Sequence, residues 1–139
     1  MKNNQTITWI EDLTFEGNVN GHKIVLDAEK KVGGKDRGPT PKPLMITSLL
    51  GCTAMDVISI LKKMRVDVKD FKVHAEAELT EEHPKHYTKI HLIYEFTGKD
   101  LPKEKLEKAV TLSQDRYCGV SYVYKKVINL TYEIKINNI

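Results

Sequence analysis

A long apolar stretch, residues 44–61, constrains the fold of this chain more than any other feature. It is long enough to cross a membrane. Asp56 near its middle opposes that interpretation, because a charged side chain at the centre of a bilayer costs about 2.5–3.5 kcal/mol on insertion scales. We therefore expect a central helix, residues 44–64, that is buried inside a globular protein and has no membrane partner.

A helix that is apolar on nearly every side needs cover on more than one face. The length of 139 residues predicts a single domain, residues 1–139. Such a domain has few other helices that could supply the cover. A partner subunit is therefore a natural solution.

Short alternating runs before this helix predict strands. Residues 6–28 form three such runs and predict an N-terminal β-meander. The clearest turn is Asn-Val-Asn-Gly at residues 18–21, because asparagine and glycine tolerate the positive φ that tight hairpins require. The following residues 29–43 are rich in glycine and proline and predict a loop, which carries Arg37.

A change of period after the helix predicts further strands. Residues 68–97 alternate with a period of two on both sides of a polar turn and predict a long antiparallel hairpin. Residues 102–126 predict helices, and residues 127–137 predict a final strand. Helices that are interleaved with antiparallel strands indicate an α+β fold rather than a doubly wound sheet.

Charge and motifs exclude several functions. The 22 basic and 19 acidic side chains give a net charge of +3 without a basic block, so nucleic acid is not an expected partner. Motifs of serine hydrolases, phosphate-binding loops and zinc proteases are absent. The histidines near residues 83–91 lack companion ligands, so we expect no metal and no cofactor. The N-terminus lacks a signal-peptide core, which favours a cytoplasmic location.

Two cysteines are the candidate reactive groups. Cys52 follows Gly51 in the central helix and is either a small buried hydrophobe or a thiol that needs access. Cys118 follows Arg116 and precedes a glycine at a predicted break between helices. If a helix starts just after Cys118, free N–H groups and Arg116 favour its thiolate. On these grounds Cys118 is either the more reactive thiol or a structural cysteine in a turn.

Asp56 is the one acid in the apolar helix. A carboxylate in apolar surroundings must find a hydrogen-bond donor or change its pKa. The simplest expectation is a structural bond from a hydroxyl group or an arginine.

The segments around the two cysteines resemble the OsmC/Ohr family, and most of all its small OsmC-like branch. The resemblance runs from Gly38 to the C-terminus and rests on Gly-Pro-x-Pro before the helix, Gly-Cys-Thr-Ala-Met-Asp-Val around Cys52, and Tyr-Cys-x-Val-Ser around Cys118. It implies an OsmC-like fold, in which antiparallel sheets surround central cysteine-bearing helices in an intertwined homodimer. Two equivalent sites would then form at the subunit interface.

The resemblance also implies a chemistry. Peroxidases of this family attack an organic hydroperoxide with the first cysteine and close a disulfide with the second, which a dithiol reductant then opens. Carried over, Cys52 is the peroxidatic thiolate and Cys118 is the resolving thiol, so the family reverses the order of reactivity that the residues alone suggest. A role in the oxidative stress response follows.

The chain departs from the family's pattern in two places. The family's glutamate falls within residues 40–43, where this chain has no acid, and the family's arginine falls in the first hairpin, where this chain has none. Arg37 and Arg116 are the candidate substitutes. We expect a weak thiol-dependent organic hydroperoxide reductase. The alternatives are a non-catalytic dimer that binds a small apolar or acyl ligand at its interface, and a dimeric scaffold with unreactive thiols.

Overall fold

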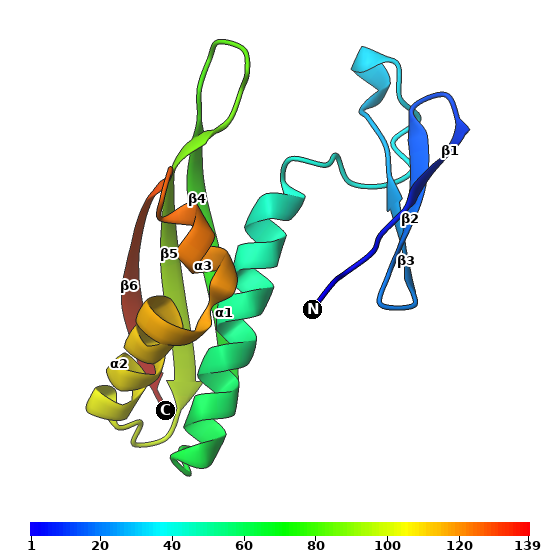
Figure 1. The fold of residues 1–139 in the computed structure, drawn as a ribbon. Helices are drawn as coiled ribbons and strands as arrows, with labels where there is room; N and C mark the ends of the chain where they lie inside the picture. The colour runs from blue at the N-terminus through cyan, green and yellow to red at the C-terminus, as the bar shows by residue number, and fades with distance from the viewer. The chain divides into compact units, whose positions relative to one another are not determined.

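The computed structural model describes residues 1–139 as two compact units, an N-terminal unit (Met1–Thr47) and a C-terminal unit (Ser48–Ile139). Figure 1 shows the elements of each. Helix α1 (Leu44–Lys63) begins in the first unit and continues through the second. The expected single domain, residues 1–139, stays a prediction.

The N-terminal unit is an antiparallel sheet of three strands in the order β1-β2-β3. These are β1 (Ile7–Glu11), β2 (Thr14–Val19) and β3 (His22–Leu26). In the turn after β2, Asn20 has φ 53° and Gly21 has φ 82°, and the Gly21 N–H donates to Asn18 Oδ1 at 2.9 Å. The predicted turn is confirmed, because both central residues adopt the left-handed backbone that asparagine and glycine allow. One 3₁₀ turn, η1 (Lys30–Val32), interrupts the predicted loop.

The C-terminal unit has helices on one face of a three-stranded sheet (Figure 1). After α1 come β4 (Asp70–Leu79), β5 (Tyr87–Gly98), α2 (Lys103–Leu112), α3 (Gly119–Tyr124) and β6 (Asn129–Asn138). A π-helical turn, η2 (Ser113–Tyr117), extends α2. This mixture of helices and small sheets confirms the α+β class.

The sheet of the C-terminal unit has the strand order β4-β5-β6. Strands β4 and β5 pair antiparallel, as the hairpin predicts, and Phe71 stacks on its register partner Phe96 with ring centroids 4.7 Å apart. Strand β6 pairs parallel to β5, so this sheet is mixed rather than wholly antiparallel. The reason is that α2 and α3 carry the chain back to the end of the sheet where β5 begins, and such a crossover produces a parallel pair.

The core of the C-terminal unit lies between the sheet and the helices. Strand β5 supplies every second side chain, and α1 supplies a stripe at a spacing of four residues. The largest fully buried side chains of these elements include Ile90, Leu92, Tyr94 and Phe96 of β5, Leu106 and Val110 of α2, and Leu49, Thr53, Val57 and Leu61 of α1. The alternation of β5 and the helical period of α1 therefore each place one face in the core.

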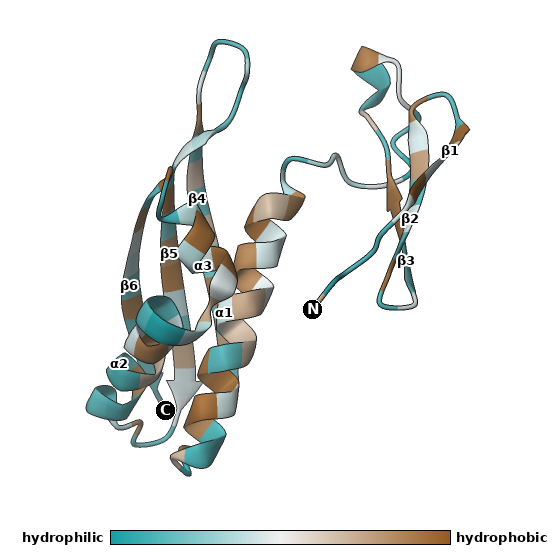
Figure 2. Ribbon diagram, in the orientation of Figure 1, coloured by the Kyte–Doolittle hydropathy of each residue, from teal (hydrophilic) through white to brown (hydrophobic).

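Helix α1 is less covered than its sequence predicts. It is long and apolar enough to cross a membrane by length and composition, and Figure 2 shows apolar residues along much of its length. Only the stripe facing the sheet is fully buried, while Met55 on another face is 76% exposed. Within the C-terminal unit, α1 thus gains cover on one face rather than on several.

Candidate functional site

The fold brings the two cysteines of the C-terminal unit together. Cys52 lies in the first half of α1, and Cys118 lies between η2 and α3. The two Sγ atoms and a carboxylate oxygen of Asp56 all lie within 4.8 Å of one another. Both cysteines are free thiols. Segments that are distant in the sequence therefore form one cluster of two thiols and one acid.

Cys118 is the more enclosed of the two thiols, with 3% of its surface exposed. It is the N-cap of α3, and its Sγ accepts the backbone N–H of Ser121 at 3.3 Å. The predicted helix directly after Cys118 is confirmed. The sulfur of Cys118 thus takes the place of the oxygen acceptor that usually caps a helix N-terminus.

Cys52 is half-buried, and its surroundings favour the protonated thiol. Burial raises the pKa of Cys52, and the hydrogen bond with Cys118 raises it further. The backbone N–H of Val120 lowers the pKa, while the negative charge of Asp56 adds to the increase. Because its pKa is raised, the Cys52 thiol is mostly protonated at neutral pH.

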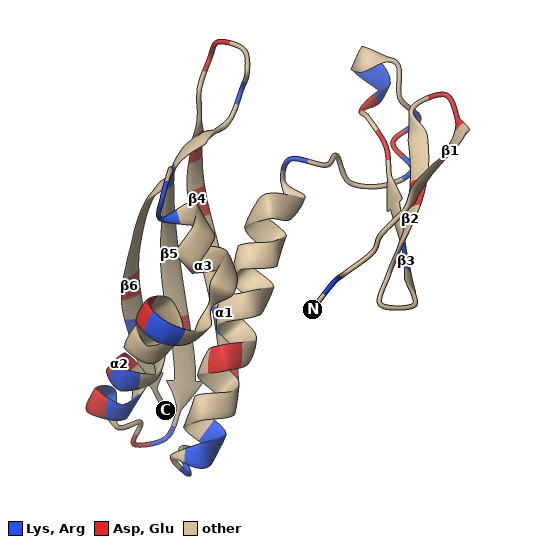
Figure 3. Cartoon of the chain, in the orientation of Figure 1, with Lys and Arg blue, Asp and Glu red and all other residues tan.

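Asp56 lies one helical turn after Cys52, so both side chains are on the same side of α1. Ser113 of η2 donates its hydroxyl hydrogen to Asp56 Oδ2 at 3.1 Å. This contact confirms the expected hydroxyl donor. Figure 3 shows that the other charges on α1 are basic and lie at its C-terminal end.

A buried hydrogen-bond network extends from Asp56 into the core. Thr53 Oγ1 lies 2.8 Å from Ser113 Oγ and 2.6 Å from the Tyr94 hydroxyl oxygen. Gln114 Nε2 donates to the same Tyr94 oxygen at 2.7 Å. Burial raises the pKa of Tyr94 to about 12, although bonds from Thr53 and Gln114 act against the increase. The network holds η2 against α1 and thereby fixes the acid beside the thiols.

Sequence reasoning did not identify Tyr94, Ser113 and Gln114 as part of the site. One signal was present: Tyr94 occupies a core position in the alternation of β5, and a buried tyrosine hydroxyl needs a hydrogen-bond partner. In the structure that partner is Thr53, whose Oγ1 lies 2.6 Å from the Tyr94 hydroxyl oxygen. No sequence pattern pairs these two residues before the sheet and helix are docked.

Two cavities open beside the cluster. One of about 400 Å³ is lined by Cys118, Arg116, Tyr117 and Lys125, among others, and the second, of about 370 Å³, is lined by Asp56 and again by Tyr117. The Arg116 guanidinium lies 5.6 Å from the centre of the Tyr117 ring, within cation–π range. Arg116 and Cys118 thus line one cavity.

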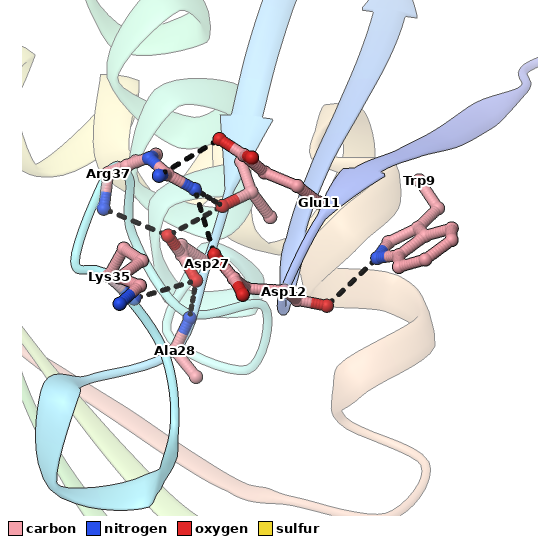
Figure 4. Close-up of polar contacts among 8 residues, drawn as sticks. Trp9, Glu11, Asp12, Asp27, Ala28, Lys35 and Arg37 are labelled. Carbon is pink, nitrogen blue, oxygen red and sulfur yellow. Dashed lines mark hydrogen bonds and ion pairs between the residues drawn. The ribbon is translucent and has the colours of Figure 1, made fainter.

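Arg37 is held by acidic and hydroxyl groups of the N-terminal unit (Figure 4). Its guanidinium lies 3.0 Å from Glu11 Oε1 and 3.6 Å from Asp12 Oδ2, and it donates to Thr14 Oγ1 at 2.8 Å. Its backbone N–H donates to Asp27 Oδ2 at 3.1 Å. Arg37 therefore already has several acceptors within its own unit.

Asp27 organises the loop that carries Arg37. Burial acts to raise the pKa of this carboxyl, but hydrogen bonds from the N–H groups of Ala28, Arg37 and Lys35 and from the Thr14 hydroxyl lower it below its usual value. Asp27 stays ionised at neutral pH, which fixes the loop between β3 and α1.

Comparison with known proteins gives consistent results. The family model described as "OsmC-like protein" matches residues 33–133. Protein YhfA of Escherichia coli strain K12 is 37% identical over 131 residues, which cover 94% of this chain and 95% of YhfA. A hypothetical protein from Aquifex aeolicus VF5 superposes with a TM-score of 0.83 at 30% identity, with 98% of each chain covered.

A more distant structure shows the same fold. It is described as an organic hydroperoxide resistance protein OsmC from Legionella pneumophila, with a TM-score of 0.70 at 13% identity and 97% of each chain covered. That protein is also described as a predicted redox protein. At this identity the likeness concerns the fold.

Proposed function

Because this chain belongs to the OsmC/Ohr family, we propose that it reduces organic hydroperoxides through a redox pair formed by Cys52 and Cys118. The observation that carries the proposal is the meeting of two free thiols within 4.8 Å from opposite halves of the sequence. Two sulfurs this close reach disulfide distance after small side-chain rotations. A reducing compartment such as the cytoplasm would keep the resting pair reduced.

The reaction proceeds in two steps before the enzyme is reset. The Cys52 thiolate attacks the terminal oxygen of R–O–O–H, so that an S–O bond forms, the O–O bond breaks, and the alkoxide leaves and takes up a proton. The Cys118 sulfur then attacks the sulfenic sulfur of Cys52, which forms the S–S bond and releases water. An external dithiol reduces the disulfide and returns both thiols.

The departing alkoxide needs a cation or a proton donor. We assign Arg116 to this neighbourhood because it lines the cavity that Cys118 also lines. Arg37 remains the second arginine candidate, and its three side-chain acceptors make it a less available cation. The raised pKa of Cys52 agrees with a weak peroxidase at neutral pH.

Peptide mapping tests the function directly. Reduced protein treated with one equivalent of cumene hydroperoxide is expected to lose both free thiols and to gain a Cys52–Cys118 disulfide. The same disulfide should form more slowly with hydrogen peroxide. The readouts are thiol counting and mass spectrometry of non-reduced peptides. Two unchanged thiols would contradict the proposal, and a small apolar molecule found by native mass spectrometry would then favour the ligand-binding alternative.

We further propose that two copies of the chain pair through the exposed apolar surface of α1. This surface includes Met55, which is 76% exposed, and the neighbouring groove is lined by Ala54 and Ile58. A second copy would cover the faces that the sheet leaves open and would remove apolar area from water.

Light scattering tests the dimer. Met55→Lys is expected to raise the dimer dissociation constant by more than roughly tenfold, because it would place a charge inside the apolar contact. Val127→Lys is the matched control, since Val127 is 82% exposed but lies outside α1. A monomeric wild-type protein, or equal effects of both substitutions, would contradict this interface.

A further inference from the structure

We propose that Cys52, Asp56 and Cys118 also form a binding site for one thiophilic divalent cation of the zinc class. The expectation of no metal rested on the histidines, whereas the fold gathers ligands from residues that the sequence keeps apart. Their three ligand atoms lie within 4.8 Å of one another. Two thiolates and one carboxylate are ligands that zinc accepts in proteins.

The spacing of these atoms is close to what a tetrahedral ion requires. With zinc–sulfur bonds near 2.3 Å and zinc–oxygen bonds near 2.0 Å, neighbouring ligand atoms lie about 3.5–3.8 Å apart. The cluster therefore needs to contract by roughly 1 Å, which side-chain rotation supplies. Cys52 and Asp56 share one side of α1, and Cys118 approaches from the η2–α3 junction. The fourth position is left for water.

Hydrogen bonds already orient all three ligands. The hydroxyl of Ser113 donates to Asp56 Oδ2 at 3.1 Å, and the N–H of Ser121 donates to Cys118 Sγ at 3.3 Å. Val120 supplies a backbone hydrogen bond to Cys52. Partners of this kind fix ligand orientation and tune affinity in metal sites.

The ion also has a route to the cluster. Tyr117 borders both cavities, one of which reaches Cys118 while the other reaches Asp56. A hydrated cation can therefore approach Cys118 through one cavity and Asp56 through the other. Access and a prepared set of hydrogen bonds distinguish the cluster from an incidental pair of thiols.

Binding is a proton exchange that needs no oxidant. One M²⁺ joins two thiols and the carboxylate already present, two metal–sulfur bonds form, and two protons pass to the buffer. The same sulfur electrons would be used in a disulfide, so the metal-bound and oxidised states exclude each other. The site does not depend on peroxide reduction and would exist in a chain with no peroxidase activity.

Metal titration of the reduced full-length protein tests the site. We expect one Zn²⁺ per chain in competition with a chromophoric chelator, and one Cd²⁺ per chain seen by sulfur-to-metal charge-transfer absorption. Cys52→Ser and Cys118→Ser should each weaken Zn²⁺ binding by at least roughly 100-fold, and Asp56→Asn by about 10-fold. Glu107→Gln on α2 is the matched acidic control and should leave binding unchanged.

Circular dichroism shows whether a variant that binds Zn²⁺ weakly is still folded. Wild-type protein alkylated at Cys52 is a second test, because it removes this metal ligand without a substitution. Wild-type-like Zn²⁺ affinity in either folded cysteine variant would overturn the site, as would an unchanged affinity of Asp56→Asn. So would binding at millimolar Zn²⁺ only. Peroxide consumption is measured separately, so a failed peroxidase proposal leaves this result interpretable.

Discussion

Substituting Cys52 by serine is expected to lower peroxide turnover by at least roughly 1000-fold, because a serine hydroxyl supplies no thiolate to attack the O–O bond. Cys118→Ser should behave differently. Its Cys52 can still consume one equivalent of cumene hydroperoxide, but no resolving thiol lies within 4.8 Å. Continued turnover then requires the external dithiol to attack the Cys52 sulfenic acid directly, and we expect it to be slower than in the wild type. The measurement is peroxide consumed per chain, with and without dithiothreitol.

The two variants must differ for the assignment to hold. A sulfenic acid trapped on Cys52 by dimedone in Cys118→Ser, and none trapped in Cys52→Ser, is the expected pattern. The reverse pattern would make Cys118 the peroxidatic thiol, which is the order that its position at the start of α3 favours. Full turnover in Cys52→Ser would remove this residue from the mechanism.

Much of the fold could be predicted because the hydrophobic period in the sequence matches the positions that are buried in the structure. The alternation of β5 places Leu92 and Tyr94 in the core, and the helical spacing of α1 does the same for Val57. The turn at Asn20–Gly21 follows from backbone preference alone. The parallel pairing of β6 could not be predicted in this way. Alternation shows which face of a strand is buried but not the direction in which the strand runs, and the crossover through α2 and α3 sets that direction.

The candidate site could be predicted only in part. The sequence identifies the two cysteines and Asp56 individually as candidate reactive residues. That their sulfur and carboxylate oxygen atoms lie within 4.8 Å of one another depends on how η2 packs on α1. That docking rests on Ser113 and Tyr94, whose hydrogen bonds join segments far apart in the chain. Residue type therefore identifies the reactive groups, and tertiary packing decides which of them meet.

The rate at which peroxide oxidises Cys52 is expected to rise about tenfold per pH unit from pH 6 to pH 8, or about 100-fold in all. Burial raises the pKa of Cys52, and Cys118 and Asp56 add to the increase. The attacking thiolate is therefore a small fraction below pH 8, and each added pH unit multiplies it. Stopped-flow oxidation of the reduced protein by excess cumene hydroperoxide measures the profile.

The Asp56→Asn variant tests whether the negative charge of Asp56 contributes to the raised pKa of Cys52. The amide removes a negative charge that opposes ionisation of Cys52 but can still accept the Ser113 hydroxyl, so the profile should shift to lower pH and the rate at pH 7 should increase. Glu107→Gln, an acid of the exposed face of α2, should leave the profile in place. A rate that is already constant below pH 7 in the wild type would mean that a cation lowers the pKa of Cys52, and Arg37→Ala and Arg116→Ala would then show which arginine supplies it.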